Sequence, residues 1–204
     1  MYPDVTGIIL AGGKSTRMGE NKSFLKLADK TVIEKVTDLM RSIFKIVLLI
    51  TNTPEEYKFL SIPIFEDIYK YKGPLAGIQS GLTNSKTQNN FVISCDIPLM
   101  TDEMIKYIVE RKTEKPISVC KADGFIQQLA GRYSKKVLPL AEEILISYTE
   151  EIRAGKQKNR KCNVLNLLDK AGSEIIDAED LSFYKENIFF NMNRPEDYKK
   201  ILKL

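Results

Sequence analysis

Short apolar runs alternate along this chain with amphipathic stretches. The runs at 8–10, 45–52, 62–67 and 90–98 are predicted strands, and 31–44 carries apolar residues at helical spacing. The run at 45–52 is continuous and rich in β-branched residues, which is typical of a strand buried on both faces. A helix between two such strands indicates a right-handed βαβ unit. The sequence therefore predicts a three-layer α/β/α domain with a Rossmann-like, mainly parallel sheet.

The second half of the chain continues this pattern. Helices are expected at 101–112, 137–152 and 164–171 and after Pro195, and strands at 116–122 and 125–133. The basic stretch at 153–161 is an expected loop; most such runs are simply solvated, and this one could also face a phosphate-bearing substrate. No repeat, low-complexity tract or linker divides the chain, so residues 1–204 are predicted to form a single domain.

Composition excludes several classes of function. The 204 residues contain no histidine and three cysteines, without a C-x-x-C motif. Catalysis by Ser-His or Cys-His pairs is thus excluded, as are most histidine-bound metals. A net charge of +4 without an aromatic-basic pattern predicts no nucleic-acid partner. No apolar run approaches the roughly 20 residues of a membrane span, and no signal peptide is evident. Together with the widely spaced cysteines, this predicts a cytoplasmic protein without a membrane partner. We also expect a monomer.

The stretch GIILAGGKSTRMGENK, residues 7–22, leads from the first apolar run into a glycine-rich loop. Gly12 and Gly13 remove side-chain bulk where the strand is expected to end, so backbone N–H groups can approach an anion closely. The cations around this loop are Lys14, Arg17 and Lys22. A triphosphate is the natural ligand, and a flexible Gly-Ser turn is the alternative.

Two familiar phosphate-binding patterns do not fit this loop. A Walker loop requires G-x-x-x-x-G-K-S/T, whereas here the Lys14-Ser15 pair comes one residue late and Gly7 heads the strand. The dinucleotide fingerprint G-x-G-x-x-G requires alternating glycines, whereas Gly12 and Gly13 are adjacent.

Polar residues follow the next three predicted strands. Asn52, Asp67 and Asp96 each come at a strand end, and ligands of open parallel sheets bind beyond the carboxyl ends of the strands. Asn52 could instead only open a turn. A lone carboxylate such as Asp96 is usually a turn former or helix cap, although Thr101 already offers a cap for the following helix.

Two further segments place small or polar residues at helix starts. In GPLAGIQSGL, residues 73–82, the glycines allow a second close backbone approach, or they pack helix against sheet. Near the C-terminus, Asn191 and Asn193 precede Pro195, which is a favourable first helical residue. Asn193 as a helix N-cap is the alternative to a place in the site.

Four motifs carry a family resemblance. L-A-G-G-x-S-x-R-M-G-x-x-K in 10–22, D…G-P-L-A-G-I in 67–78, C-D-x-P in 95–98 and N-x-N-x-P-E-D in 191–197 resemble motifs of the molybdenum cofactor guanylyltransferases. The resemblance spans nearly the whole chain and is weakest from 115 to 185. It implies the nucleotide-diphospho-sugar transferase type of fold. Asn21 and Arg194 depart from the aspartate and threonine expected there.

The resemblance also implies the site. Lys22, Arg17 and Asp96 would be catalytic, Asp96 would bind Mg²⁺ with Asn193 as a candidate second ligand, and Asn191 and Asn193 would face the acceptor. Asp96 would carry an uncompensated charge when no cation is bound. The implied GTP-binding residues are Leu10, Ala11, Gly12, Gly13, Lys14, Ser15, Lys22, Asn52, Asp67, Gly73, Leu75, Gly77 and Asp96.

The implied reaction is transfer of GMP from GTP to the phosphate of molybdopterin, free or molybdenum-loaded, with release of pyrophosphate. This nucleophile is already an anion, so no general base is needed, in accord with the missing histidine. A cytidylyltransferase acting on molybdopterin and a sugar-phosphate nucleotidyltransferase are the alternatives. A nucleotide-binding regulatory module is a third, which would be expected to lack the carboxylate or the loop lysine; this chain retains both Asp96 and Lys22.

Overall fold

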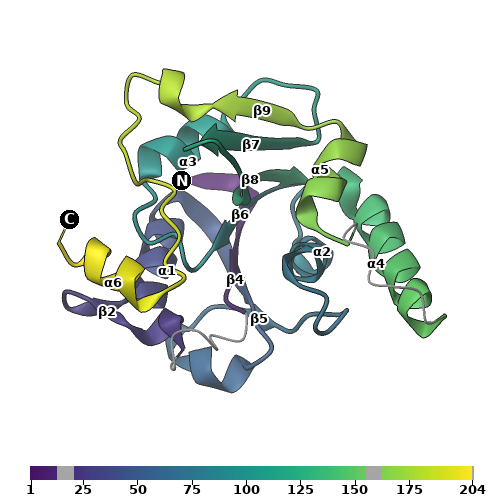
Figure 1. Ribbon diagram of the computed structural model, residues 1–204, viewed down its shortest axis with the longest axis horizontal. Coiled ribbons are helices and arrows are strands. Elements are labelled where there is room, and N and C mark those ends of the chain that lie inside the picture. Colours follow the sequence, from purple (N-terminus) through teal and green to yellow (C-terminus); the bar gives the residue numbers. More distant parts are fainter. Residues whose placement is uncertain (13–20, 155–161, 204) are drawn as a thin grey trace.

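The computed structural model describes residues 1–12, 21–154 and 162–203, and within them seven strands form one sheet (Figure 1). The strand order is β5–β4–β1–β6–β8–β7–β9. All neighbouring pairs are parallel except those of β8, which is antiparallel to β6 and β7. The strands are β1 (Tyr2–Leu10), β4 (Phe44–Ile50), β5 (Ile64–Phe65), β6 (Asn89–Ser94), β7 (Ile117–Ala122), β8 (Phe125–Ser134) and β9 (Glu174–Asp177). The predicted mainly parallel sheet is confirmed.

Helices cover both faces of this sheet (Figure 1). One face carries α1 (Val32–Ile43) and α3 (Asp102–Val109), and the other carries α2 (Pro74–Asn84), α4 (Leu138–Arg153) and α5 (Val164–Ala171). Successive residues of a strand point to opposite faces. Accordingly Ile8 packs in the core cluster of α2, whereas Ile9 packs in that of α1 and α3. The predicted three-layer architecture is confirmed.

Caps define several of the helix ends. In a capping box at the start of α1, Glu34 N donates to Thr31 Oγ1 at 3.4 Å and Thr31 N donates to Glu34 Oε2 at 2.7 Å. Thr101 caps α3 by accepting from Met104 N at 3.3 Å, as expected. α5 ends at Gly172, whose φ of 68° suits a residue without a side chain.

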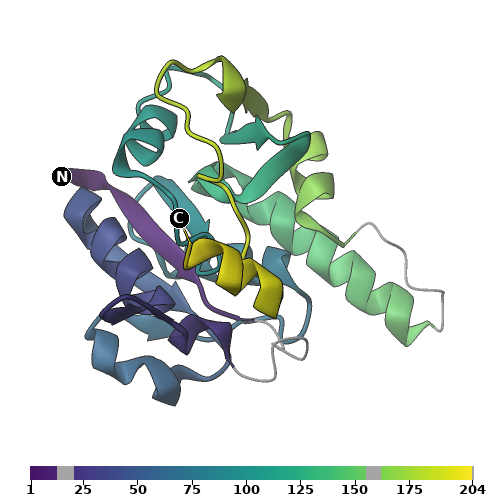
Figure 2. The same ribbon diagram turned by 60° about the vertical axis from the view of Figure 1, so that its left-hand side comes forward.

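The C-terminal helix α6 (Pro195–Ile201) packs beside a small hairpin of β2 (Lys26–Leu27) and β3 (Lys30–Thr31) (Figure 1). Leu27, Met192 and Ile201 share a separate apolar cluster there. The end of α4 extends beyond the sheet (Figure 2). The 3₁₀ helices are η1 (Lys22–Phe24), η2 (Pro54–Leu60), η3 (Lys135–Val137) and η4 (Ala178–Asp180). None of the described helices is long and apolar enough to cross a membrane.

Some boundaries differ from the prediction. The strand expected at 62–67 is only two residues long, and the helix expected at 101–112 ends at Val109. β9 was not predicted, because its sequence Glu-Ile-Ile-Asp lies at a sheet edge and has no apolar run. These differences do not affect the parallel pairing of β1, β4, β5 and β6.

Candidate nucleotide-binding site

The carboxyl ends of four parallel strands lie in register. Leu10 at the end of β1 pairs with Ile50 of β4 and Ser94 of β6, and Ile50 pairs with Phe65 of β5. The residues that follow these strand ends are therefore brought to one edge of the sheet. This is the position where open α/β sheets bind ligands.

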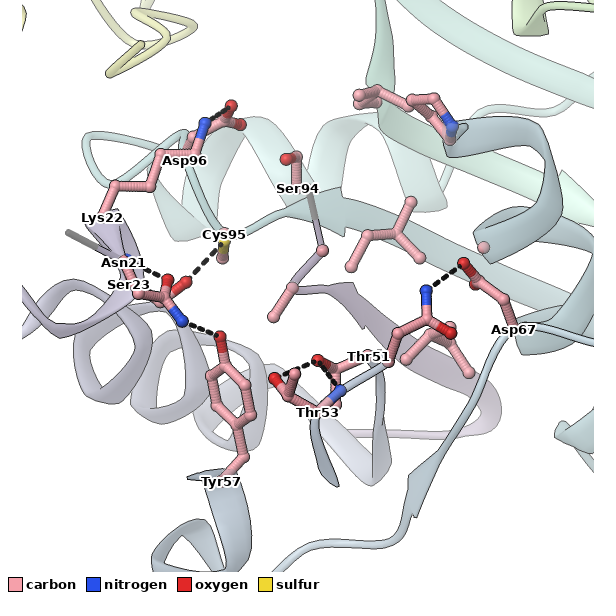
Figure 3. Close-up of a pocket in the computed structure, with 18 of the residues that line it drawn as sticks. Asn21, Lys22, Ser23, Thr51, Thr53, Tyr57, Asp67, Ser94, Cys95 and Asp96 are labelled. Atoms are coloured by element: carbon pink, nitrogen blue, oxygen red, sulfur yellow. Dashed lines mark hydrogen bonds and ion pairs between the residues drawn. The ribbon is translucent and has the colours of Figure 1, made fainter. Parts of the chain in front are cut away.

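A cavity of about 950 Å³ opens at this edge (Figure 3). Its walls include most of the predicted site residues that the structure describes. These are Leu10, Ala11, Gly12, Lys22, Asn52, Asp67, Gly73, Gly77 and Asp96. The predictions on Gly13, Lys14, Ser15 and Arg17, and on residues 155–161 of the basic stretch, lie outside the described residues. Arg153, which was expected in the loop, is the last residue of α4.

Asn52 and Asp67 form a polar pair at one end of the cavity. Asn52 Nδ2 donates to Asp67 Oδ2 at 2.7 Å. Asn52 Oδ1 is buried and has no hydrogen-bond partner among the described residues. Burial raises the pKa of the Asp67 carboxyl, against the lowering effect of the Asn52 hydrogen bond. This end therefore presents acceptors to a ligand, and Asn52 does more than open a turn.

The glycines of 73–82 serve two purposes. Gly73, with φ of 74°, and Gly77 line the cavity. A Cβ on Gly81 would lie 2.6 Å from Ile8 Cγ2, so this glycine lets α2 pack against the sheet. Leu75 is fully buried in the core cluster that contains Ile8, and it does not line the cavity. The packing interpretation therefore holds for Gly81, and Gly73 and Gly77 remain the candidates for close approach to a ligand.

Lys22 and Asp96 form an ion pair at the other end of the cavity. Lys22 Nζ lies 2.5 Å from Asp96 Oδ2, and both side chains are largely buried, at 17% and 11% exposed. Lys22 Nζ also donates to Asn193 Oδ1 at 3.0 Å. The expectation that Asp96 lacks a compensating charge without a metal is therefore wrong. Its partner is 74 residues away in sequence, and only the folded chain brings the two together.

The oxygen atoms here suit a hard divalent cation. Asp96 Oδ1 is buried without a hydrogen-bond partner among the described residues. Asn193 Oδ1 and Asp96 Oδ2 both accept hydrogen bonds from the Lys22 ammonium group. The described residues contain no cluster of three or more His, Cys, Asp or Glu side chains that could hold a metal alone. Magnesium commonly takes one or two protein carboxylates and completes its shell with phosphates and water. The residues present fit that pattern.

The start of α6 fixes Asn193 in this position. Asp197 Oδ2 accepts from the backbone N–H groups of Asn193 and Arg194, both at 2.8 Å, and Arg194 is the N-cap residue. Asn193 is therefore not the N-cap, and its side chain reaches Lys22. Met192 N donates to the Asp96 carbonyl at 2.9 Å, which ties the two segments together. Asn191 bonds to the Phe189 carbonyl, and neither asparagine lines the cavity, although Asn193 contacts its wall at Lys22.

Several cavity residues were not predicted. Asn21 Nδ2 donates to Tyr57 Oη at 3.1 Å (Figure 3) and to Glu56 Oε2 at 3.1 Å. An aspartate at position 21 would place a second carboxylate beside Glu56, which gives a reason for asparagine here. The remaining lining residues without a prediction are Ser23, Ile50, Thr51, Thr53, Tyr71, Pro74, Ser94, Cys95 and Leu129. Tyr57 and Tyr71 lie in a 3₁₀ helix and a loop, where no strand-end signal marks them.

Cys95 is the cysteine of the cavity. Its Sγ lies 3.3 Å from Ser23 Oγ, and burial raises the pKa of the thiol to about 11. A thiol with this pKa is protonated at neutral pH and is a poor nucleophile. The charged groups described at the cavity therefore favour binding and positioning of an anionic ligand over covalent catalysis.

Comparison with known proteins agrees with this geometry. Residues 7–160 match the MobA-like NTP transferase domain family. The chain is 34% identical over 203 residues to a Carboxydothermus hydrogenoformans protein named "Probable molybdenum cofactor guanylyltransferase", covering 98% of this chain and 96% of that protein. It is also 34% identical to an Aquifex aeolicus protein of the same name, with 98% and 90% covered.

Solved structures support the fold. Molybdopterin-guanine dinucleotide biosynthesis protein A from Archaeoglobus fulgidus superposes with a TM-score of 0.79 at 22% identity, with 97% of each chain covered. A Mycobacterium tuberculosis protein solved in complex with manganese has a TM-score of 0.64 at 15% identity, with 98% of each chain covered. By its match to the family model and its identity to these relatives, this chain belongs to the molybdenum cofactor guanylyltransferase family of MobA-like NTP transferases.

Proposed function

We propose that this protein transfers GMP from GTP to the phosphate of molybdopterin, free or molybdenum-loaded, and releases pyrophosphate. The observation that carries the proposal is the register of four strand ends, which places Gly12, Asn52, Asp67 and Asp96 around one cavity. The names of the curated relatives supply the reaction.

The chemistry needs no general base. The attacking phosphate is an anion at neutral pH, the chain has no histidine, and the Cys95 thiol is protonated. The demands on the protein are in-line positioning of the two phosphates and neutralisation of the charge that develops on them. A cavity with a lysine at one end and amide and carboxyl acceptors at the other suits those demands.

We assign the nucleoside to the end at Asn52 and Asp67, where Gly73 and Gly77 allow close backbone approach. The phosphates are assigned to the end at Gly12, Lys22 and Asp96. By the family resemblance, Lys14, Arg17 and the amides of 12–19 would hold the triphosphate.

Asp96 and Asn193 would hold the divalent cation, which we propose is Mg²⁺. When bound, it would supply positive charge to the α-phosphate and to the leaving pyrophosphate. In the ligand-free protein, Lys22 Nζ bonds to both Asp96 Oδ2 and Asn193 Oδ1. We propose that Lys22 exchanges Asp96 for a phosphate oxygen when the nucleotide binds. We also propose that residues 1–204 act as one domain, because Lys22 and Asn193 join the two ends of the chain at one site.

The test is pyrophosphate release with GTP, CTP, ATP or UTP and either molybdopterin or a hexose 1-phosphate as acceptor. We expect turnover only when GTP is combined with molybdopterin, and the Asp96→Asn variant should be inactive with this pair. Turnover with CTP would indicate a cytidylyltransferase, and turnover with the hexose phosphate would indicate a sugar nucleotidyltransferase. Nucleotide binding without turnover on any acceptor would favour a regulatory module.

A further inference from the structure

We propose that Tyr71 binds the face of the nucleobase and is a specificity residue of the nucleoside end of the cavity. This inference rests on the proposed function and extends it to a residue that the motifs do not mark. Tyr71 lines the cavity, yet 84% of it is exposed to solvent. An aromatic ring left exposed on the rim of a ligand cavity is available to cover an apolar ligand surface.

The backbone of Tyr71 is in an unusual conformation. Its φ is 64°, in the left-handed region that non-glycine residues rarely adopt. Ala28 and Asp123 also have positive φ, but they lie in the two-residue turns of the hairpins β2–β3 and β7–β8, where the turn geometry requires it. Ser61 is the C-cap of η2, and Asn187 is an asparagine, a residue type that tolerates this conformation. Tyr71 lies in a turn that is not part of a hairpin, and a bulky residue held in this conformation is a candidate ligand-binding position.

Two contacts tie the loop that carries Tyr71 to neighbouring helices. Ile68 N donates to Ser80 Oγ of α2 at 2.8 Å. On the other side, Lys72 Nζ lies 5.0 Å from the ring centroid of Tyr148 in α4. The loop joins β5 to α2 beside α4 (Figure 1). An aromatic side chain on a fixed backbone loses little conformational freedom when it binds a ring.

The other groups at this end complement a planar base. Asn52 and Asp67 offer acceptors that suit the edge of a base, and Gly73 and Gly77 offer backbone without bulk. Those groups suit the edges of a ring rather than its flat face. Tyr71 supplies an apolar face at the same rim, and stacking between a base and an aromatic side chain is a substantial, geometry-dependent contribution to binding. A purine, with the larger face, would gain more than a pyrimidine.

The absence of tryptophan from the sequence allows a direct test. Tyr71→Trp creates a protein whose tryptophan fluorescence comes from this position alone. With Mg²⁺ present, GTP should quench that fluorescence in a saturable way, and tripolyphosphate, which lacks a base, should not. Phe125→Trp is the matched control, because Phe125 is 72% exposed in β8 and does not line the cavity. Its fluorescence should not respond to GTP.

Affinity gives a second, independent readout. Tyr71→Ala should weaken GTP binding about tenfold, equivalent to about 1.4 kcal/mol, whereas Tyr71→Phe should bind GTP like the wild type. Affinity for tripolyphosphate should be the same in all three proteins. Unchanged GTP affinity in Tyr71→Ala, or equal quenching by tripolyphosphate and GTP, would overturn the inference. If the Tyr71 inference fails but GTP still stabilises the wild type, the proposed function survives. If GTP does not bind the wild type at all, both the Tyr71 inference and the proposed function are wrong.

Discussion

The polar groups at the two ends of the cavity have different kinds of partner. At the phosphate end, Lys22 bonds to Asp96 at 2.5 Å and to Asn193 at 3.0 Å, so the protein's own ammonium group neutralises the carboxylate. At the nucleoside end, Asn52 and Asp67 share one hydrogen bond of 2.7 Å, and no cation among the described residues forms an ion pair with Asp67. A ligand must displace an internal contact at the first end, whereas the second end already presents acceptors. Binding of phosphate and metal should therefore be coupled to rearrangement of Lys22, and binding of the base should not.

The largest expected effect comes from removing the carboxylate of the phosphate end. Asp96→Asn keeps the shape of the side chain but loses the charge that a hard cation requires. We expect kcat/KM for pyrophosphate release to fall about 10³-fold or more. The matched control is Asp102→Asn, which removes an exposed carboxylate paired with Lys106 in α3. The control should keep full activity. Retained turnover in Asp96→Asn would show that the metal is held elsewhere.

Removing Lys22 at the same end should affect both catalysis and stability. Lys22→Met should lower kcat/KM about 10²-fold and also destabilise the ligand-free protein, because Asp96 is then left largely buried without a cation. We expect a loss of about 2 kcal/mol, or a melting temperature roughly 4–8 °C lower. Mg²⁺ should restore part of that loss. Lys30→Met, which breaks an exposed pair with Asp38, is the control and should melt like the wild type. An unchanged melting temperature in Lys22→Met would contradict the structural role of the pair.

The smallest expected effect is at the nucleoside end. Burial holds the pKa of Asp67 above its ordinary value of 3.8, so the folded state binds this proton more tightly than the unfolded state. The ionised carboxylate therefore costs stability above the raised pKa, and that cost disappears as the pH falls below 3.8.

Asp67→Asn should accordingly raise the melting temperature at pH 7 by about 1–3 °C. The gain should shrink as the pH is lowered through the raised pKa. Thermal unfolding of wild type and variant between pH 7 and pH 4 measures this difference, with the exposed Asp29→Asn as control. A variant that melts lower than the wild type at pH 7 would show that the Asn52 hydrogen bond outweighs the cost of burial.

The sequence predicted the layers of the fold and the strand-end residues of the cavity wall, because strand ends in a parallel sheet obey simple rules. A buried strand such as 45–52 and a capped helix such as α5 carry local signals strong enough to be read directly. Contacts between distant segments carry no such signal. The Lys22–Asp96 pair, the hydrogen bond from Asn21 to Tyr57 and the edge strand β9 depend on how the chain folds back on itself. The exposure of Tyr71 follows from a loop conformation that no motif specifies.

One measurement tests both ends of the cavity together: thermal unfolding of the wild type with GTP, CTP, ATP or UTP, each with Mg²⁺ and with EDTA. We predict that Mg²⁺ with GTP gives the largest rise, roughly 5–10 °C at a concentration about 100 times its Kd. EDTA should remove most of that rise, because the phosphate end then lacks the cation that replaces Lys22 at Asp96. A larger rise with CTP would contradict the assignment of guanine to the nucleoside end. A rise with GTP that is the same in EDTA would contradict the assignment of a metal to Asp96.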